Sequence, residues 1–74
     1  MAKVTKVLSN TIRRLRFDAD EMTQQALADA IGVSRQTVVA IEKGNYSPSL
    51  EVAFKIANVF AIPLEQVFRY EQGD

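Results

Sequence analysis

Hydrophobic residues recur along most of this chain at the spacing of amphipathic helices. Ile12 and Leu15 follow Ser9 and Asn10, either of which can cap a helix, and they predict a first helix over residues 10–16 or 10–17. The acidic residues that follow are expected to end this helix.

The middle of the chain predicts two short helices separated by one glycine. The first runs from Gln24 to Ile31, and Gly32 ends it because glycine enters the left-handed region without steric cost. Ser34 is placed to cap the second, which runs over residues 35–43 and stops at the next glycine. The chain must therefore turn sharply between them.

The last third predicts two more helices. The fourth, about Ser49 to Phe60, presents a wide apolar stripe. Its members are Leu50, Ala53, Phe54, Ile56, Ala57 and Phe60. Pro63 is suited to the first turn of a fifth, short helix that ends near residue 68. We therefore expect an all-α fold of five helices.

Both ends of the chain carry short stretches typical of strands. Residues 68–71 alternate apolar and polar side chains, and residues 3–6 are similarly rich in β-branched types. We expect these stretches to form a short antiparallel β pair, with disordered termini as the alternative. The pair would need support from the helices or from a second subunit.

The hydrophobic core is predicted from the apolar positions that face the inside of these helices. They are Leu15, Met22, Leu27, Ile31, Val33, Val38, Ile41, Leu50, Ala53, Ile56, Ala57 and Leu64. Nothing among them indicates a cofactor site.

The length of 74 residues leaves room for one domain, residues 1–74, with a modest core. Such a chain is only marginally stable alone, which makes a dimer plausible. It contains no cysteine and no histidine, so disulfides, the usual zinc sites and Cys/His or Ser/His catalysis are excluded. No apolar run is long enough to span a membrane. We expect a soluble cytoplasmic protein with no enzymatic activity, no cofactor and no small-molecule ligand.

The net charge of zero argues against a nucleic-acid-binding protein, but the charges are unevenly distributed. Residues 1–16 contain no acid and five cations, Lys3, Lys6, Arg13, Arg14 and Arg16, whereas the next stretch is acidic. The alternative interpretation is ordinary solvated helix faces.

The two helices joined through Gly32 form a helix-turn-helix pattern over residues 23–43, in which the small Ala28 allows close crossing. The stretch MTQQALADAIGVSRQTVVAIEKG at residues 22–44 resembles the Cro and phage-repressor family, also called XRE. The resemblance covers roughly residues 10–68 and implies a lambda-repressor-like fold. One departure lies before the motif, where residues 15–24 are one residue longer than is usual and lack a glycine.

The resemblance implies that the second motif helix, residues 34–43, enters the major groove of DNA. Base readout would then fall to Arg35, Gln36, Thr37 and Ala40. Arg35 can pair with guanine, Gln36 with adenine, and the methyl groups of Thr37 or Ala40 with a thymine methyl. Either polar side chain can instead bind phosphate. Val39 fits neither the buried nor the base-reading side of this helix.

Contacts to the DNA backbone are expected at both ends of the motif. Gln24 lies at the start of the first motif helix, where free N–H groups attract a phosphate, and Ser34 can be both a cap and a phosphate ligand. Lys43, Asn45 and Tyr46 follow the recognition helix. Helix propensity for Gln24 and plain solvent exposure for the last three are the alternatives.

Two structural roles also follow from the resemblance. Arg16 and Glu42 are expected to form an ion pair. A two-fold contact near the fifth helix is expected to use Ile62, Leu64, Val67, Phe68 and Tyr70. The leading hypothesis is a sequence-specific repressor that binds a palindromic site in double-stranded DNA as a homodimer. The alternative is a protein-interaction module, such as an antitoxin-like protein, with the same fold.

Overall fold

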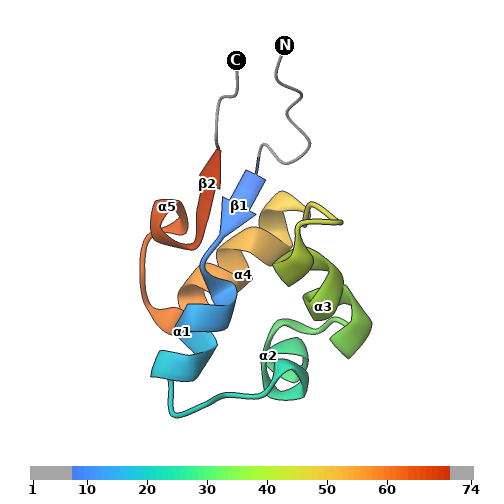
Figure 1. Ribbon diagram of the computed structural model, residues 1–74, viewed down its shortest axis with the longest axis vertical. Coiled ribbons are helices and arrows are strands. Elements are labelled where there is room, and N and C mark those ends of the chain that lie inside the picture. The colour runs from blue at the N-terminus through green and yellow to red at the C-terminus, as the bar shows by residue number, and fades with distance from the viewer. Residues whose placement is uncertain (1–7, 71–74) are drawn as a thin grey trace.

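The computed structural model describes residues 8–70, which form five helices and two short strands (Figure 1). In chain order these are β1 Leu8–Asn10, α1 Ile12–Asp18, α2 Gln24–Ile31, α3 Arg35–Lys43, α4 Leu50–Phe60, α5 Leu64–Val67 and β2 Phe68–Tyr70. The strands lie at one end of the molecule and α2 at the other (Figure 1). Within residues 8–70 no helix is long and apolar enough to cross a membrane.

The two motif helices begin and end where the sequence predicts, because caps define both ends. The Thr23 side chain accepts a hydrogen bond from the Ala26 amide at 2.9 Å, and Ser34 Oγ accepts one from the Thr37 amide at 3.1 Å. Gly32 adopts the left-handed conformation with φ 77°, and its amide donates to the Ala28 carbonyl at 2.8 Å. The sharp turn between α2 and α3 therefore depends on this glycine.

Helix α1 begins two residues later than the sequence predicts because the chain before it is extended. Asn10 ends β1 instead of starting the helix, and Thr11 takes the N-cap position without a side-chain cap. The Asn10 side chain accepts a hydrogen bond from the Ile12 amide at 3.1 Å and donates one to the Ile41 carbonyl at 3.0 Å. This asparagine therefore links the start of α1 to α3.

The β pair forms at the predicted C-terminal stretch but with a different partner. Strand β1 pairs antiparallel with β2, with Leu8 opposite Tyr70. Residues 3–6, which were expected to be the partner, and Glu71 lie outside the described part of the chain, and within that part β2 pairs with residues 8–10. The Thr11 amide donates to the Val67 carbonyl at 2.9 Å, which places residues 8–10 beside residues 68–70.

The capping residues of α4 and α5 likewise determine where these two helices begin. Ser49 caps α4 by accepting from the Val52 amide at 3.2 Å, so the helix itself begins at Leu50. Pro63 is the N-cap of α5 and not, as predicted, a residue of its first turn.

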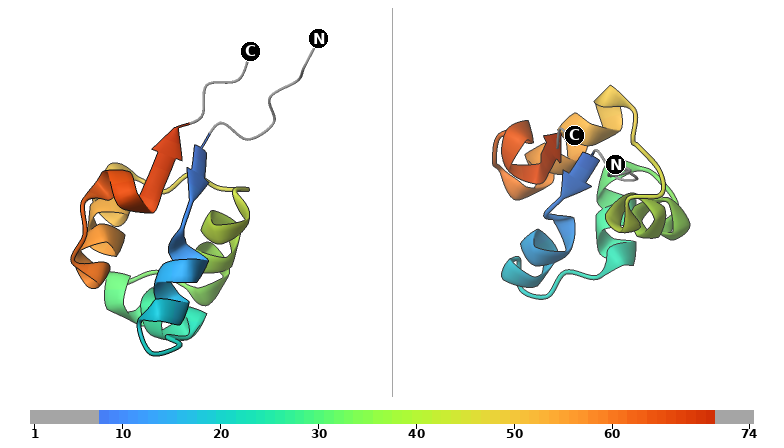
Figure 2. Two further views of the ribbon diagram at one scale, coloured as in Figure 1. Left: turned by 60° about the vertical axis from the view of Figure 1, so that its left-hand side comes forward. Right: turned by 45° about the horizontal axis from the view of Figure 1, so that its top comes forward.

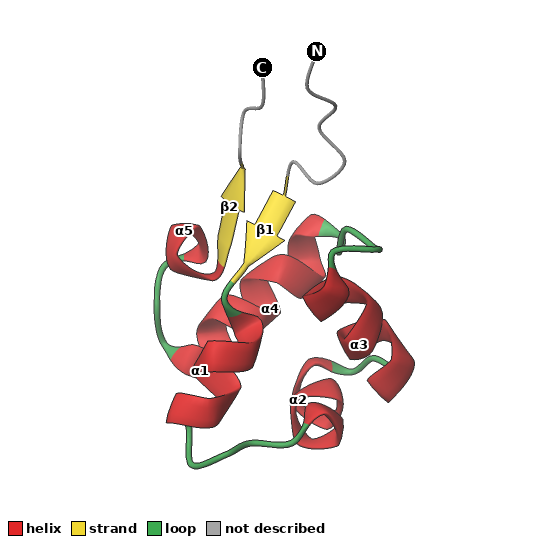
Figure 3. Cartoon of the chain, in the orientation of Figure 1, coloured by secondary structure: helices red, strands yellow, loops and turns green. Residues whose placement is uncertain are grey.

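Helix α2 packs against α3 and α4, while α5 lies across the molecule from α3 (Figures 2 and 3).

The core lies between the helices and largely follows the predicted periodicity. Its buried hydrophobic residues are Ile12, Leu27, Ala28, Ile31, Val38, Ile41, Ala53, Ile56, Ala57 and Val67. The predicted core residues Leu15, Met22, Val33 and Leu64 are partly buried and pack against this cluster.

Two predictions about buried residues are wrong. Leu50 is 69% exposed, because the buried side of α4 centres on Ala53 and Ile56 and leaves the first residue of the helix at its edge. Val67 is 1% exposed and belongs to the core of its own chain, so it is not available for a contact between subunits.

The turn at Gly32 can be tested by Gly32→Ala. A Cβ at this position meets nothing within 4 Å, so the substitution imposes only the strain of the left-handed backbone. We expect the free energy of unfolding, measured by urea denaturation, to fall by about 1 kcal/mol. Ala61→Gly is the reverse test, since Ala61 already has φ 56°, and we expect it to raise the free energy of unfolding by about 1 kcal/mol because it relieves the same strain. Unchanged stability in Gly32→Ala would contradict the requirement for glycine.

Candidate nucleic-acid interface

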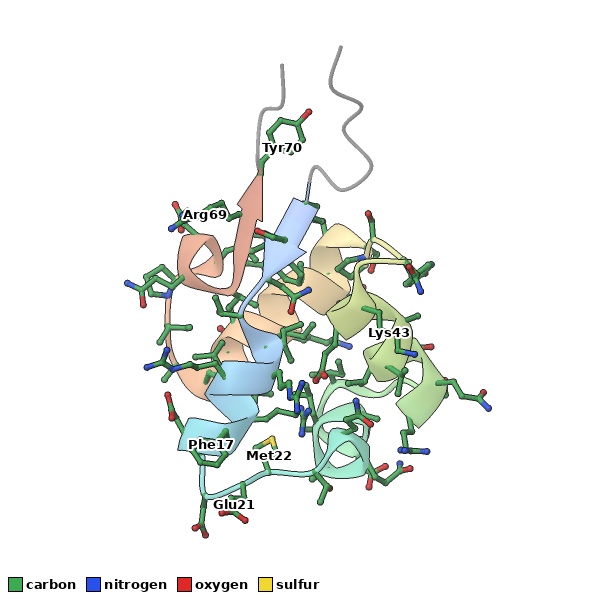
Figure 4. The ribbon with its side chains drawn as sticks, viewed as in Figure 1. Phe17, Glu21, Met22, Lys43, Arg69 and Tyr70 are labelled. Atoms are coloured by element: carbon green, nitrogen blue, oxygen red, sulfur yellow. The ribbon has the colours of Figure 1, made fainter. Side chains whose placement is uncertain are left out.

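Two of the four residues expected to read bases, Arg35 and Gln36, are exposed on α3, and the other two, Thr37 and Ala40, are partly buried. On the same helix Lys43 is exposed and Val39 is partly buried. Successive residues of an α-helix lie about 100° apart around its axis. Gln36 and Lys43 (labelled in Figure 4) therefore share the centre of the outward side of α3, opposite the buried Val38 and Ile41. The helix therefore presents one polar face to solvent.

A concavity of about 550 Å³ opens between this face of α3 and the neighbouring helices. Its lining is Arg13, Arg16, Thr23, Gln24, Gln25, Arg35, Val39, Glu42 and Lys43. We call this surface the cationic concavity. It joins residues of α1, the first turn of α2 and the length of α3, so it exists only in the folded chain.

The charges of the cationic concavity are unbalanced. Glu42 is its one carboxylate and is paired with Arg16. Among the described residues, Arg13, Arg35 and Lys43 take part in no ion pair, whereas Arg14 pairs with Asp18 on the other side of α1. A chain with no net charge thus gathers free cations on one surface, and such a surface attracts an anion.

Arg16 and Glu42 lie in contact at the base of the cationic concavity. Arg16 Nε lies 2.6 Å from Glu42 Oε2, and Arg16 Nη2 donates to Glu42 Oε1 at 3.1 Å. A third guanidinium nitrogen, Nη1, donates to the Met22 carbonyl at 2.8 Å. The two side chains are 15% and 9% exposed. This bidentate pair ties α1, the loop before α2, and α3 into one unit.

The structure places Gln24 in this network as well as at the start of α2. Its Nε2 donates to Glu42 Oε1 at 3.3 Å. A side-chain amide has two N–H donors, so one remains for another acceptor. The phosphate contact expected of Gln24 stays a prediction, and the structure adds a role in orienting Glu42.

Ser34 and Thr37 form a local hydroxyl pair at the start of α3. Their oxygens lie 3.0 Å apart, in addition to the cap that Ser34 makes to the Thr37 amide. Asn45 and Tyr46 are exposed in the loop after α3 and lie outside the cationic concavity. The structure therefore brings Gln24, Arg35 and Lys43 together, and leaves Asn45 and Tyr46 apart from them.

Arg13 and Val39 both line the cationic concavity, although the sequence pattern assigned no role to either residue. Arg13 lies on the exposed side of α1, three residues before Arg16. The spacing of Arg13 to Arg16 places both on one side of the helix, which is the signal that could have found Arg13.

The residues expected at the subunit contact differ in their exposure. Tyr70 is 71% exposed at the tip of β2 (Figure 4), whereas Ile62, Leu64 and Phe68 are partly buried and pack against the core. Their part in a dimer stays a prediction.

A protein-family model described as helix-turn-helix matches residues 12–67. The chain belongs to this helix-turn-helix family. The match spans α1 to α5 and contains the whole cationic concavity, including Arg13.

Curated relatives of this helix-turn-helix protein carry regulatory names. It is 55% identical over 53 residues to an uncharacterized HTH-type transcriptional regulator of Methanocaldococcus jannaschii, covering 72% of this chain and 80% of that protein. It is 43% identical over 65 residues to the uncharacterized regulator YgzD of Bacillus subtilis, covering 88% and 97%. The cryptic phage CTXphi transcriptional repressor RstR of Vibrio cholerae is 38% identical over 61 residues, which cover 82% of this chain and 54% of RstR.

The largely buried ion pair can be tested by Glu42→Gln, which keeps the shape of the side chain and removes its charge. Arg16 would then lie, 15% exposed, beside a neutral amide, and we expect the free energy of unfolding to fall by about 3 kcal/mol. Glu51→Gln is the control, because Glu51 is 78% exposed in its pair with Lys55 and should contribute less than about 0.5 kcal/mol. Equal losses in chemical denaturation of the two variants would contradict the structural role of Glu42.

Proposed function

We propose that this protein is a sequence-specific transcriptional repressor that binds a palindromic site in double-stranded DNA as a homodimer, through a lambda-repressor-like arrangement of its five helices. The observation that carries the proposal is the cationic concavity beside the exposed face of α3. A phosphate of the DNA backbone would bind among Arg13, Arg35 and Lys43, and the polar face of α3 would lie in the major groove.

The repressor role is supported by the likeness to RstR, which is named as a transcriptional repressor. A repressor needs only to occupy its site on DNA. The proposed role therefore requires no surface for catalysis or for an effector beside the DNA-binding face.

The homodimer is supported by the position of α5 and β2 across the molecule from α3 (Figure 2), because a contact there leaves both recognition helices free.

Within this proposal the residues of α3 divide into two groups. Gln36 lies at the centre of the outward side and reads a base, with Thr37 and Ala40 beside it. Lys43 and Ser34 bind the backbone at the two ends of the helix, together with Gln24 from α2, and Asn45 and Tyr46 extend this contact. Arg35 lies at the edge of the cationic concavity, where it reaches a guanine or a phosphate.

Selection of bound duplexes from a random pool tests the proposal. We expect an inverted repeat with half-sites about one helical turn apart. On the selected site, Gln36→Ala should cost about 1 to 3 kcal/mol and relax preference at one position, whereas Lys43→Ala should weaken all sequences alike. Binding titrations at several salt concentrations measure both effects. A protein that prefers no sequence over its non-specific affinity would contradict the proposal and favour a protein-interaction module.

Arg13 and Arg14 provide a matched pair for the backbone contacts in the same assay. Arg13 lines the cationic concavity, and its neighbour Arg14 pairs with Asp18 outside it. Arg13→Gln should lower the slope of binding against salt by about one unit, and Arg14→Gln should leave it unchanged. Equal slopes for the two variants would remove Arg13 from the interface.

Dimer formation is tested by sedimentation equilibrium on the full chain and on Tyr70→Ser. We expect a dimer at micromolar concentration, and a dissociation constant raised about tenfold or more in Tyr70→Ser, because an exposed aromatic ring is a typical anchor of such contacts. Tyr46→Ser is the control, since Tyr46 is 54% exposed in the loop after α3. A full chain that stays monomeric, or equal effects of the two tyrosines, would rule out β2 as the contact.

A further inference from the structure

Val39 is an apolar side chain in an otherwise polar setting. It lies in the second turn of α3, is partly buried and lines the cationic concavity. It is absent from the partly buried hydrophobic residues that pack against the core cluster. Core packing therefore does not account for a valine here.

The neighbours of Val39 place it on the surface proposed to meet DNA. Arg35 and Lys43 lie four residues before and after it on the same side of α3, and Gln36 lies three residues before it. Helix propensity does not favour valine at this position, because a β-branched side chain loses rotamer freedom in a helix. A contact outside this chain would bury the part of this apolar group that the chain itself leaves exposed.

The unpaired cations around Val39 determine whether this contact is made with a second copy of the chain or with DNA. A second copy of the chain packed here about a two-fold axis would bring Arg13, Arg35 and Lys43 of both copies together, and like charges oppose such a contact. A DNA major groove satisfies both features, since it offers phosphates for the cations and one kind of apolar group, the 5-methyl of thymine.

We propose that Val39 contacts the 5-methyl group of a thymine in the bound site and so determines one position of its sequence. This inference rests on the proposed DNA-binding function and adds a specificity residue to it. The two methyl groups of Val39 exclude water from the thymine methyl, while Lys43 binds the flanking backbone. Recognition at this position is apolar and does not involve the hydrogen-bonding edge of the base.

Replacement of thymine by deoxyuridine tests the inference, because it removes the methyl group and leaves base pairing unchanged. Each thymine of the selected duplex is replaced in turn, and affinities are measured for the wild type, Val39→Ala and Gln36→Ala. We expect one position in each half-site at which the wild type binds the uracil duplex about fourfold more weakly, the effect of exposing one methyl group. At that position Val39→Ala should bind both duplexes equally, and Gln36→Ala should retain the fourfold difference.

Two controls keep the test independent of folding and of the neighbouring methyl groups. The unfolding midpoint of Val39→Ala should match that of the wild type, because Val39 lies outside the core cluster. Ala40→Gly should not abolish the fourfold difference at the Val39 position. A wild type and a Val39→Ala variant that respond alike to uracil at every position would overturn the inference and leave the proposed function intact. A failure to select any site would overturn both.

Discussion

The bidentate contact between Arg16 and Glu42 determines how the helix-turn-helix stands on the rest of the fold. Two charged groups that are nearly buried are costly to desolvate, and this cost is offset only when their hydrogen bonds are well satisfied. Here the guanidinium also binds the Met22 carbonyl, and the carboxylate also accepts from Gln24. The resulting network fixes the angle between α1 and α3, and with it the distance between the cations of the two helices.

Local chemistry explains which parts of the fold could be predicted from sequence. The bounds of α2 and α3 were predicted to the residue because Thr23, Gly32 and Ser34 define them within one turn of the chain. The partner of β2 could not be predicted, because residues 8–10 have no strand pattern and are held extended by their pairing with residues 68–70 and by the contact of Thr11 with Val67. The exposure of Leu50 likewise depends on which arc of α4 its neighbours cover.

The same distinction applies to the candidate site. Periodicity alone places Gln36 and Lys43 on the outward side of α3, since that side is set by the buried Val38 and Ile41. Arg13 and Val39 join the site only after α1 and α3 are placed against each other, which depends on long-range contacts. The zero net charge pointed away from nucleic acid, because a sum over the chain does not show which cations are already paired.

Among the described residues, the unpaired cations of the cationic concavity are separated from the ion pairs, so this surface carries a local positive potential. A chain without a net charge has little long-range attraction to a polyanion, but a local positive surface turns toward one at short range. For a regulator of the kind proposed, α3 would be turned toward the duplex just before contact is made. This alignment acts over about one Debye length, roughly 8 Å at physiological salt, so orientation happens in the last step of approach.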